Sequence, residues 1–409
     1  MVRHLVYFEA LGSLAENTEG WRRIFAGLVV LRLIDLSVSE SRPDCGVDAA
    51  TIHSVRSSVL ALKETDSAKP ILLSLVEAVE NGTGLIRISE MLLDYARSLD
   101  FDSSWRLASD VLTTVVELAP ADTHPIAIDA NTMLGGVARR VGEWDASAAG
   151  YASAAHAAAV IGDTARSLKA EVGMANTHLA HGNLPAAEKM LDTVVAEARE
   201  HELTDVLELA LHDRATVAHG FGEYASAIEY GYEALELCPG GTERDALLGD
   251  IAASFAELGM RDAARDAHLI VSATSQSERV VNLAKLNLME LAALDGVEEV
   301  FESYAADLNG SILDVRLRAY YLLYLGQGQR RFGRLDAAAQ SLERARSFAS
   351  AEGLHQIVFE ADKALSAAAT EWATWPAASA TVLPIKATPT TFRVARELTQ
   401  MRELAFAGQ

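Results

Sequence analysis

The feature that most constrains the fold is a ladder of small residues that recurs along the chain at a fixed spacing. Within residues 325–345, the ladder reads Gly326, Gly333, Ala338, Leu342 and Ala345. A glycine can adopt the left-handed conformation that ends one helix, and small side chains in the next helix let two helix axes approach closely. The ladder therefore predicts a tight helical hairpin, with Ala187, Ala227 and Ala338 buried where the paired helices touch.

The same ladder predicts a series of hairpins. Its turn glycines are Gly142, Gly182, Gly222, Gly259, Gly296 and Gly333. In the repeat that turns at residue 296, Met289 and Phe301 stand where the others carry small residues, which predicts a looser or locally repacked hairpin. Upstream, Ser103 replaces the turn glycine, and further hairpins are expected to turn near Gly20 and Asp66. About eight hairpins follow, a number typical of a solenoid.

This pattern resembles the tetratricopeptide repeat (TPR), which reads W-x2-L-G-x2-Y, then A-x3-F, then P. The L-G pair recurs at 134–135 and 325–326, Ser147 and Tyr151 match A-x3-F conservatively, and Pro120 and Pro239 match the closing proline. No repeat opens with the tryptophan, and most repeats are longer than the family's unit, as in bacterial regulatory solenoids and motor light chains. The resemblance implies an all-α, right-handed superhelical solenoid whose first helices line a groove.

We expect three parts in the chain. They are degenerate helical hairpins at 1–83, a TPR-like solenoid at 84–371, and a tail at 372–409. The proline-rich start of the tail should be extended, and a last helix at 392–406 should follow it, capped by Thr390 or Thr391. That helix either caps the final hairpin or occupies the groove of the same or a neighbouring molecule, and the last arrangement would be a route to self-association.

The charge balance limits the classes of partner. Acidic residues outnumber basic ones by 57 to 35, which gives a formal net charge of −22. Such a chain repels phosphate backbones and anionic membranes, so nucleic acid and membranes are not expected as partners. Two cysteines in 409 residues favour a reducing compartment, and the first 35 residues lack the pattern of a signal peptide, so we expect a cytoplasmic location.

Sequence motifs for catalysis are missing. The chain has no P-loop, no G-x-S-x-G, no H-E-x-x-H and no paired C-x-x-C, so we expect neither enzyme activity nor a cofactor. His178 and His181 lie one repeat before His212 and His219, and stacked repeats could bring three of them together around a metal ion. No cysteine or acidic spacing reinforces that cluster, so a metal site is not predicted.

The resemblance also implies which side chains line the groove. Transferred position by position, the expected partner-binding residues are Arg139, Arg140, Asn176, His212, Thr216, His219, Gln327, Arg330 and Arg331. The arginine pairs either clamp an acidic or C-terminal carboxylate ligand, or lie at exposed helix ends where the helix dipole favours cations. Of the Lys/Asn/Asn/Lys/Arg clamp found in chaperone-binding members, only Asn176 is matched, so that clamp is not predicted.

These observations favour a non-catalytic scaffold or adaptor that binds a protein or peptide through the groove. The alternative is a ligand-responsive sensor in which a small molecule or peptide changes the pitch of the superhelix, as in bacterial regulators with similar repeats. No DNA-binding or catalytic domain occurs in these 409 residues, so a sensor would pass its signal to a separate effector chain. The identity of the partner is not encoded in any motif.

Overall fold

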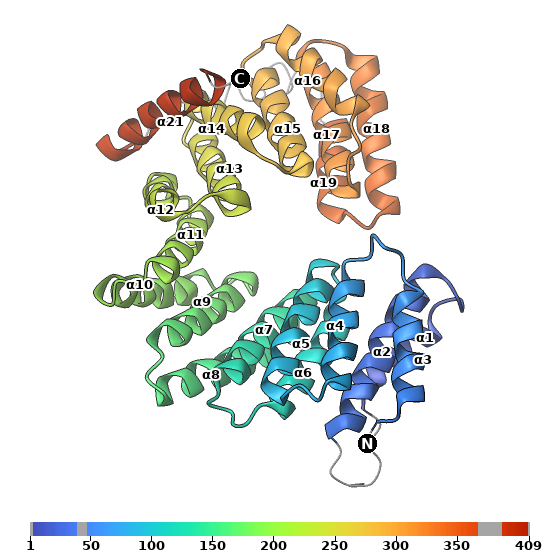
Figure 1. The fold of residues 1–409 in the computed structure, drawn as a ribbon. Helices are drawn as coiled ribbons and strands as arrows, with labels where there is room; N and C mark the ends of the chain where they lie inside the picture. Colours follow the sequence, from blue (N-terminus) through green and yellow to red (C-terminus); the bar gives the residue numbers. More distant parts are fainter. Residues whose placement is uncertain (1–2, 39–46, 367–386, 408–409) are drawn as a thin grey trace. The chain divides into compact units, whose positions relative to one another are not determined.

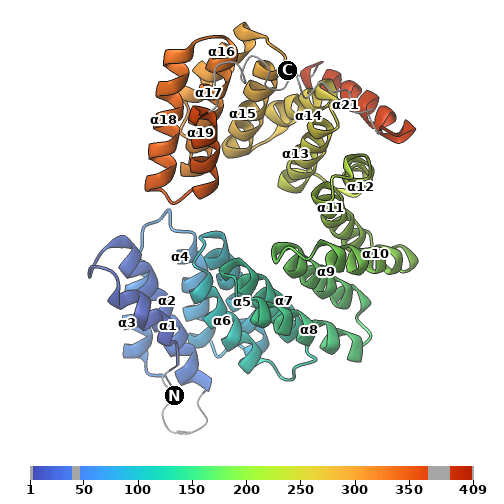
Figure 2. The same cartoon turned by 180° about the vertical axis from the view of Figure 1, so that it is seen from behind.

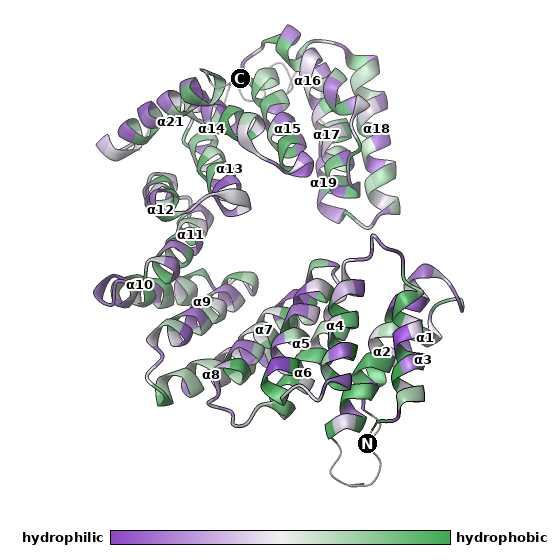
Figure 3. Cartoon of the chain, in the orientation of Figure 1, coloured by the Kyte–Doolittle hydropathy of each residue, from purple (hydrophilic) through white to green (hydrophobic). Residues whose placement is uncertain are grey.

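The computed structural model describes residues 3–38, 47–366 and 387–407. Within these ranges the regular elements are α-helices and no strand occurs, so the all-α prediction is confirmed (Figure 1). Apolar and polar residues are interleaved along the helices, as amphipathic helices require (Figure 3). Contacts within the chain divide it into two compact units, Met1–Val206 and Leu207–Gln409.

The first unit is built from consecutive antiparallel helices. They are α1 (Leu5–Gly12), α2 (Glu19–Val38), α3 (Ala49–Leu60), α4 (Ala68–Glu80), α5 (Leu85–Phe101), α6 (Trp105–Leu118), α7 (Pro125–Val141), α8 (Trp144–Val160), α9 (Thr164–Ala180), α10 (Leu184–Glu200) and the start of α11 (Thr204–Gly220). From α4 to α10 each helix packs against the next. One core cluster extends from Tyr7 to Val137, and a smaller one surrounds Tyr151.

The second unit continues the same pattern after α11. Its helices are α12 (Tyr224–Leu237), α13 (Gly241–Glu257), α14 (Arg261–Thr274), α15 (Glu278–Leu294), α16 (Glu298–Gly310), α17 (Val315–Arg331), α18 (Leu335–Ala351), α19 (His355–Ser366) and α21 (Pro389–Ala407). The described ranges hold nine hairpins, α1/α2 to α17/α18, where about eight were expected. Several odd-numbered first helices adjoin one another, α5, α7 and α9 in the first unit and α15, α17 and α19 in the second, and the side formed by the first helices is called the first-helix face.

Left-handed turns join the paired helices as predicted. The six turn glycines, from Gly142 to Gly333, have φ between +74° and +83°. Ser103 adopts φ +58° and replaces glycine in the turn between α5 and α6. Asp66 lies in the turn before α4, where its carboxylate accepts the N–H of Ala68 at 2.9 Å. The hairpin expected near Gly20 turns at residues 13–18, between α1 and α2, and Gly20 itself lies in the first turn of α2, where Thr18 accepts the N–H of Trp21.

Small residues allow the helices to cross closely. The ring of Tyr151 lies between two glycines of first helices: a Cβ on Gly135 would lie 2.7 Å from its Cδ2, and a Cβ on Gly173 would collide with the same ring. In the last complete hairpin, a Cβ on Gly326 would lie 2.7 Å from Cγ of Leu342. The three alanines expected at such crossings, Ala187, Ala227 and Ala338, are at most 2% exposed.

The hairpin without small residues is repacked. Phe301 and Met289 are fully buried, and the Phe301 ring lies 5.4 Å from that of Phe332, centroid to centroid. Room for the larger ring comes from the next first helix, where Gly328 faces it and any Cβ would collide with Phe301. Of the two expected outcomes, local repacking is the observed one.

The last helix is neither at the final hairpin nor in the groove. α21 packs against α14 and α12, which are second helices in the middle of the unit (Figures 1 and 2). Its cap is Thr388, whose Oγ1 accepts the N–H of Thr391 at 3.2 Å, so the expected caps Thr390 and Thr391 lie inside the helix. Pro389 fits its first position, where an N–H is not required. The expected extended segment lies largely outside the described residues, and the three-part division stays a prediction.

Candidate binding site

The nine residues expected in the groove all lie on first helices. Arg139 and Arg140 are on α7, Asn176 is on α9, and the other six are on α11 and α17. Three therefore belong to the first unit and six to the second, so they are not one described site. Asn176 and Gln327 are half-buried on their helices.

Three of the expected residues line a hollow on the first-helix face of the second unit. His212, Thr216 and His219 of α11 lie on one side, and Asp250 and Ser254 of α13 on the other. Apolar lining comes from Ala215, Ala227, Gly231, Leu247, Ile251 and Ala253. The cavity volume of about 90 Å³ admits one small aliphatic side chain. It is well below the roughly 300–1,000 Å³ of pockets for drug-sized ligands.

Both histidines reach across the hollow from α11 to α13. Nε2 of His212 lies 2.8 Å from Oδ2 of Asp250, and this hydrogen bond raises the pKa of His212 against the opposing effect of burial. Nδ1 of His219 lies 3.0 Å from Oγ of Ser254. The Ser254 hydroxyl donates to the carbonyl of Asp250 at 3.0 Å, so it accepts from His219, and the tautomer with hydrogen on Nδ1 follows. In the neutral ring, Nε2 of His219 is then an acceptor.

Comparison with known proteins finds solved structures that resemble this chain. No protein-family model matches the sequence, and no curated protein matches it. Similar solved structures include a tetratricopeptide repeat protein from Parabacteroides merdae, with 16% identity over 67% of this chain and 98% of that one and a TM-score of 0.44. NprR in complex with its cognate peptide NprX is 15% identical over 83% and 94%, with a TM-score of 0.46. The apo form of RapI is 11% identical over 82% and 98%, with a TM-score of 0.48.

The chain's own geometry decides the fold assignment. Glycine turns recur in the hairpins from α7/α8 to α17/α18, and small residues occupy most of their crossings. Neighbouring first helices such as α7 and α9, or α15 and α17, lie side by side. The fold is a TPR-like solenoid of helical hairpins. In such a solenoid the first-helix face is the surface on which ligands are usually held.

Two of the four groove arginines of this TPR-like solenoid hold neighbouring helices together. Nη1 of Arg140 donates to both carboxylate oxygens of Asp100 on α5, at 2.7 and 2.9 Å. Nη1 of Arg330 donates to the carbonyl of Ala364 on α19 at 2.6 Å. Arg139 is half-buried, and its Nε has no hydrogen-bond partner among the described residues. Arg140 and Arg330 are therefore not the unengaged cations that a carboxylate clamp requires.

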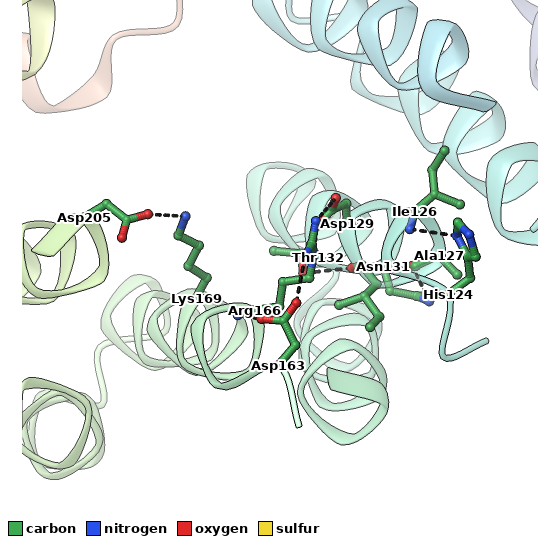
Figure 4. Close-up of polar contacts among 11 residues, drawn as sticks. His124, Ile126, Ala127, Asp129, Asn131, Thr132, Asp163, Arg166, Lys169 and Asp205 are labelled. Atoms are coloured by element: carbon green, nitrogen blue, oxygen red, sulfur yellow. Dashed lines mark hydrogen bonds and ion pairs between the residues drawn. The ribbon is translucent and has the colours of Figure 1, made fainter. Parts of the chain in front are cut away.

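A polar network on the first-helix face of the first unit was not anticipated (Figure 4). Arg166 of α9 donates from Nε to Asp129 of α7 at 2.8 Å, and from Nη1 to Asp163 at 2.7 Å. These carboxylates raise the pKa of Arg166 above its usual range. Lys169 donates to Asp205 at the start of α11, at 2.6 Å. The sequence signal was present, because each partner lies 37 or 36 residues away, about one repeat.

Glu290 is a further first-helix residue that the sequence interpretation missed. It lies on α15, and burial raises its pKa to about 7, while Arg331 and a hydrogen bond from Tyr324, both on α17, act in the opposite direction. Burial in turn lowers the pKa of Arg331. Glu290 follows Met289 as Gly136 follows Gly135, so it stands at a position that the resemblance assigns to the groove. It was overlooked because Met289 is not a small residue.

The four histidines considered for a metal site are divided between the two units, with His178 and His181 in the first and His212 and His219 in the second. His181 stacks on Trp144, with ring centroids 5.4 Å apart, while His212 and His219 flank the hollow. In the part of the chain that the structure describes, no group of three or more His, Cys, Asp or Glu side chains could hold a metal ion. None of the described helices is long and apolar enough to cross a membrane.

Proposed function

We propose that the chain is a non-catalytic adaptor that binds a peptide or a protein segment on the first-helix face of its second unit. The supporting observation is the hollow between α11 and α13, which combines an apolar floor with polar groups around its rim. One aliphatic side chain of the ligand enters the hollow, and its main chain bonds to the rim. Nε2 of His219 accepts an N–H, and Nδ1 of His212, the ring nitrogen that does not face Asp250, donates to a carbonyl when the ring is protonated.

Charge favours a basic ligand over the acidic one that the arginine pairs suggested. His212 lies within the field of Asp250, Asp213 and Glu208, and Glu208 also lies close enough to Glu243 to interact with it. On a chain with a formal net charge of −22, this field attracts a segment that carries Lys or Arg beside its aliphatic residue.

We place this adaptor in the cytoplasm, because a chain of 409 residues with two cysteines is typical of a reducing compartment.

Selection from a display library of short random peptides tests this proposal. Ala253 is an exposed residue at the rim, so Ala253→Trp covers the hollow without entering the core. Ala180→Trp is the matched control, because Ala180 is an exposed alanine of the first helix α9 that does not line the hollow. Peptides selected on the wild type should pair an aliphatic with a basic residue, and Ala253→Trp should weaken them by roughly tenfold or more. Equal affinity for both variants would contradict the proposal.

A ligand-responsive sensor is the second candidate. It is favoured by one observation, the docking of α21 on the second helices α12 and α14, because α12 also contributes to the wall of the hollow. A sensor needs an element whose position depends on the ligand.

A further inference from the structure

The C-terminal helix α21 connects two neighbouring hairpins on the side opposite to their first helices. It packs against α14 and, less extensively, α12, all within the second unit. Thr391, Val394 and Leu398 of α21 are fully buried. These residues lie at i, i+3 and i+7, so they form one stripe that is covered only while α21 is docked.

Polar contacts attach α21 to α14. Asp266 of α14 is 5% exposed, and it accepts hydrogen bonds from Oγ1 of Thr399 at 2.7 Å and from Nη1 of Arg402 at 2.5 Å. A buried carboxylate without partners is costly, so Asp266 favours the docked position of a helix that provides both donors.

A separate set of contacts attaches α21 to α12. Oγ1 of Thr388, the capping residue, donates to Glu229 at 2.5 Å. The guanidinium of Arg393 lies 5.7 Å from the ring centroid of Tyr232, and the hydroxyl of Tyr232 is hydrogen-bonded to Glu397. α21 therefore has specific partners in both hairpins, α11/α12 and α13/α14.

The same two hairpins form the hollow. Its polar contacts, His212 to Asp250 and His219 to Ser254, run from the first helix of one hairpin to the first helix of the other. Neighbouring repeats move against each other as packed helical units, so a change in their separation alters the contacts on both sides together.

We propose that α21 is a strap that sets the separation of hairpins α11/α12 and α13/α14, and thereby couples the hollow to the C-terminal end of the chain. The inference rests on the proposed function only for the identity of the ligand. Because coupling free energies are reciprocal, a ligand that prefers the strapped separation tightens α21, and a ligand that prefers another separation releases it. Release would uncover the stripe of Val394 and Leu398 together with the carboxylate of Asp266.

A matched pair of substitutions on α21 provides the test. Leu398→Asp places a charge in the buried stripe, whereas Gln400→Asp places the same charge two residues away on the exposed side. Hydrogen exchange of residues 389–407 reports release, and the pKa of His212, followed by NMR, reports the contact with Asp250. We expect Leu398→Asp to speed exchange in α21 by roughly tenfold or more. The pKa of His212 should fall back toward 6.5, and Gln400→Asp should change neither.

A milder variant keeps the test decisive if Leu398→Asp does not fold. The double variant Thr399→Ala and Arg402→Ala removes both partners of Asp266 without adding a charge, and the same two readouts apply. A released α21 with an unchanged pKa of His212 would overturn the strap.

The two proposals fail separately. A shift in the pKa of His212 on release of α21 supports the strap even if no library peptide binds, and that outcome would count against the proposed function alone. Peptides that bind the hollow with the same affinity in wild type and Leu398→Asp, while α21 is released, would overturn the coupling and leave the binding site intact.

Discussion

At the residue scale, His4 fastens the start of the chain to the first unit. Its ring is buried, with Nδ1 2.6 Å from Asp110 of α6 and Nε2 3.1 Å from Asp35 of α2. Burial alone would lower the pKa of His4, but hydrogen bonds to Asp110 and Asp35 together outweigh it and raise the pKa to about 9. His4 is therefore an imidazolium at neutral pH, and it links α1, α2 and α6.

This arrangement predicts the pH dependence of stability. The folded pKa of about 9 exceeds the ordinary value of 6.5, so the stabilisation is complete below pH 6.5 and is lost as the pH rises to about 9. The free energy of unfolding should fall by roughly 1–3 kcal/mol over this window. Urea titrations followed by circular dichroism at both ends of the window measure it. His4→Gln should abolish most of this dependence, and an equally steep loss in that variant would assign the effect to another group.

At the scale of the element, the close crossings depend on residues without side chains. Gly326 of α17 faces Leu342 of α18, and a Cβ there would also lie 3.0 Å from the backbone nitrogen of Leu342. Gly249 of α13, by contrast, has nothing within 4 Å of a Cβ position. Gly326 therefore allows two helices to pack closely, whereas Gly249 has no packing partner.

Alanine at these two positions should change stability in opposite directions. Gly249→Ala should raise the free energy of unfolding by about 1 kcal/mol, because alanine favours the helix and meets open space. Gly326→Ala gains the same propensity, but it must push α17 from α18, and overpacking typically costs roughly 1–3 kcal/mol. Thermal and urea unfolding of the two variants distinguish the effects. Stabilisation by both substitutions would show that α17 and α18 can separate freely.

At the scale of the whole molecule, ion pairs join residues one repeat apart in both units. The separations along the chain are 37 for Arg166 and Asp129, 36 for Lys169 and Asp205, 35 for Arg279 and Asp314, and 34 for Arg261 and Asp295. Each pair connects one hairpin to the next. Stability should therefore be a sum of local terms, in which damage to one repeat affects its neighbours first.

Adjacent alanines of α18 test this locality. Ala338 is 1% exposed and Ala339 is exposed, so Ala338→Phe overpacks the crossing by roughly 1–3 kcal/mol while Ala339→Phe is nearly neutral. Hydrogen exchange of the Ala338→Phe variant should lose protection in α17, α18 and α19, and α5 to α9 should keep theirs. Uniform loss of protection along the chain would contradict a repeat-by-repeat account.

The sequence by itself determined the hairpins and their crossings. Glycine is the residue that takes positive φ at little cost, so Gly142 and Gly333 mark turns without reference to the rest of the chain. Small residues at a fixed spacing on both sides of such a turn restrict how two consecutive helices can meet. The positions of His212, Thr216 and His219 on a first helix also follow from the repeat, and all three line the hollow.

Only the tertiary structure decided which surfaces meet over long distances. The apolar stripe of α21 indicates that one face of the helix is buried, but the stripe could pack on any apolar surface. The donors Thr399 and Arg402 favour α14 because the carboxylate of Asp266 lies there. The sequence likewise indicated that Arg140 is a ligand-binding cation, whereas in the structure Arg140 binds Asp100, which lies 40 residues earlier in the chain. Helix turns are local in sequence, whereas the partner of an exposed charge or of a helix face depends on the packing of separate elements.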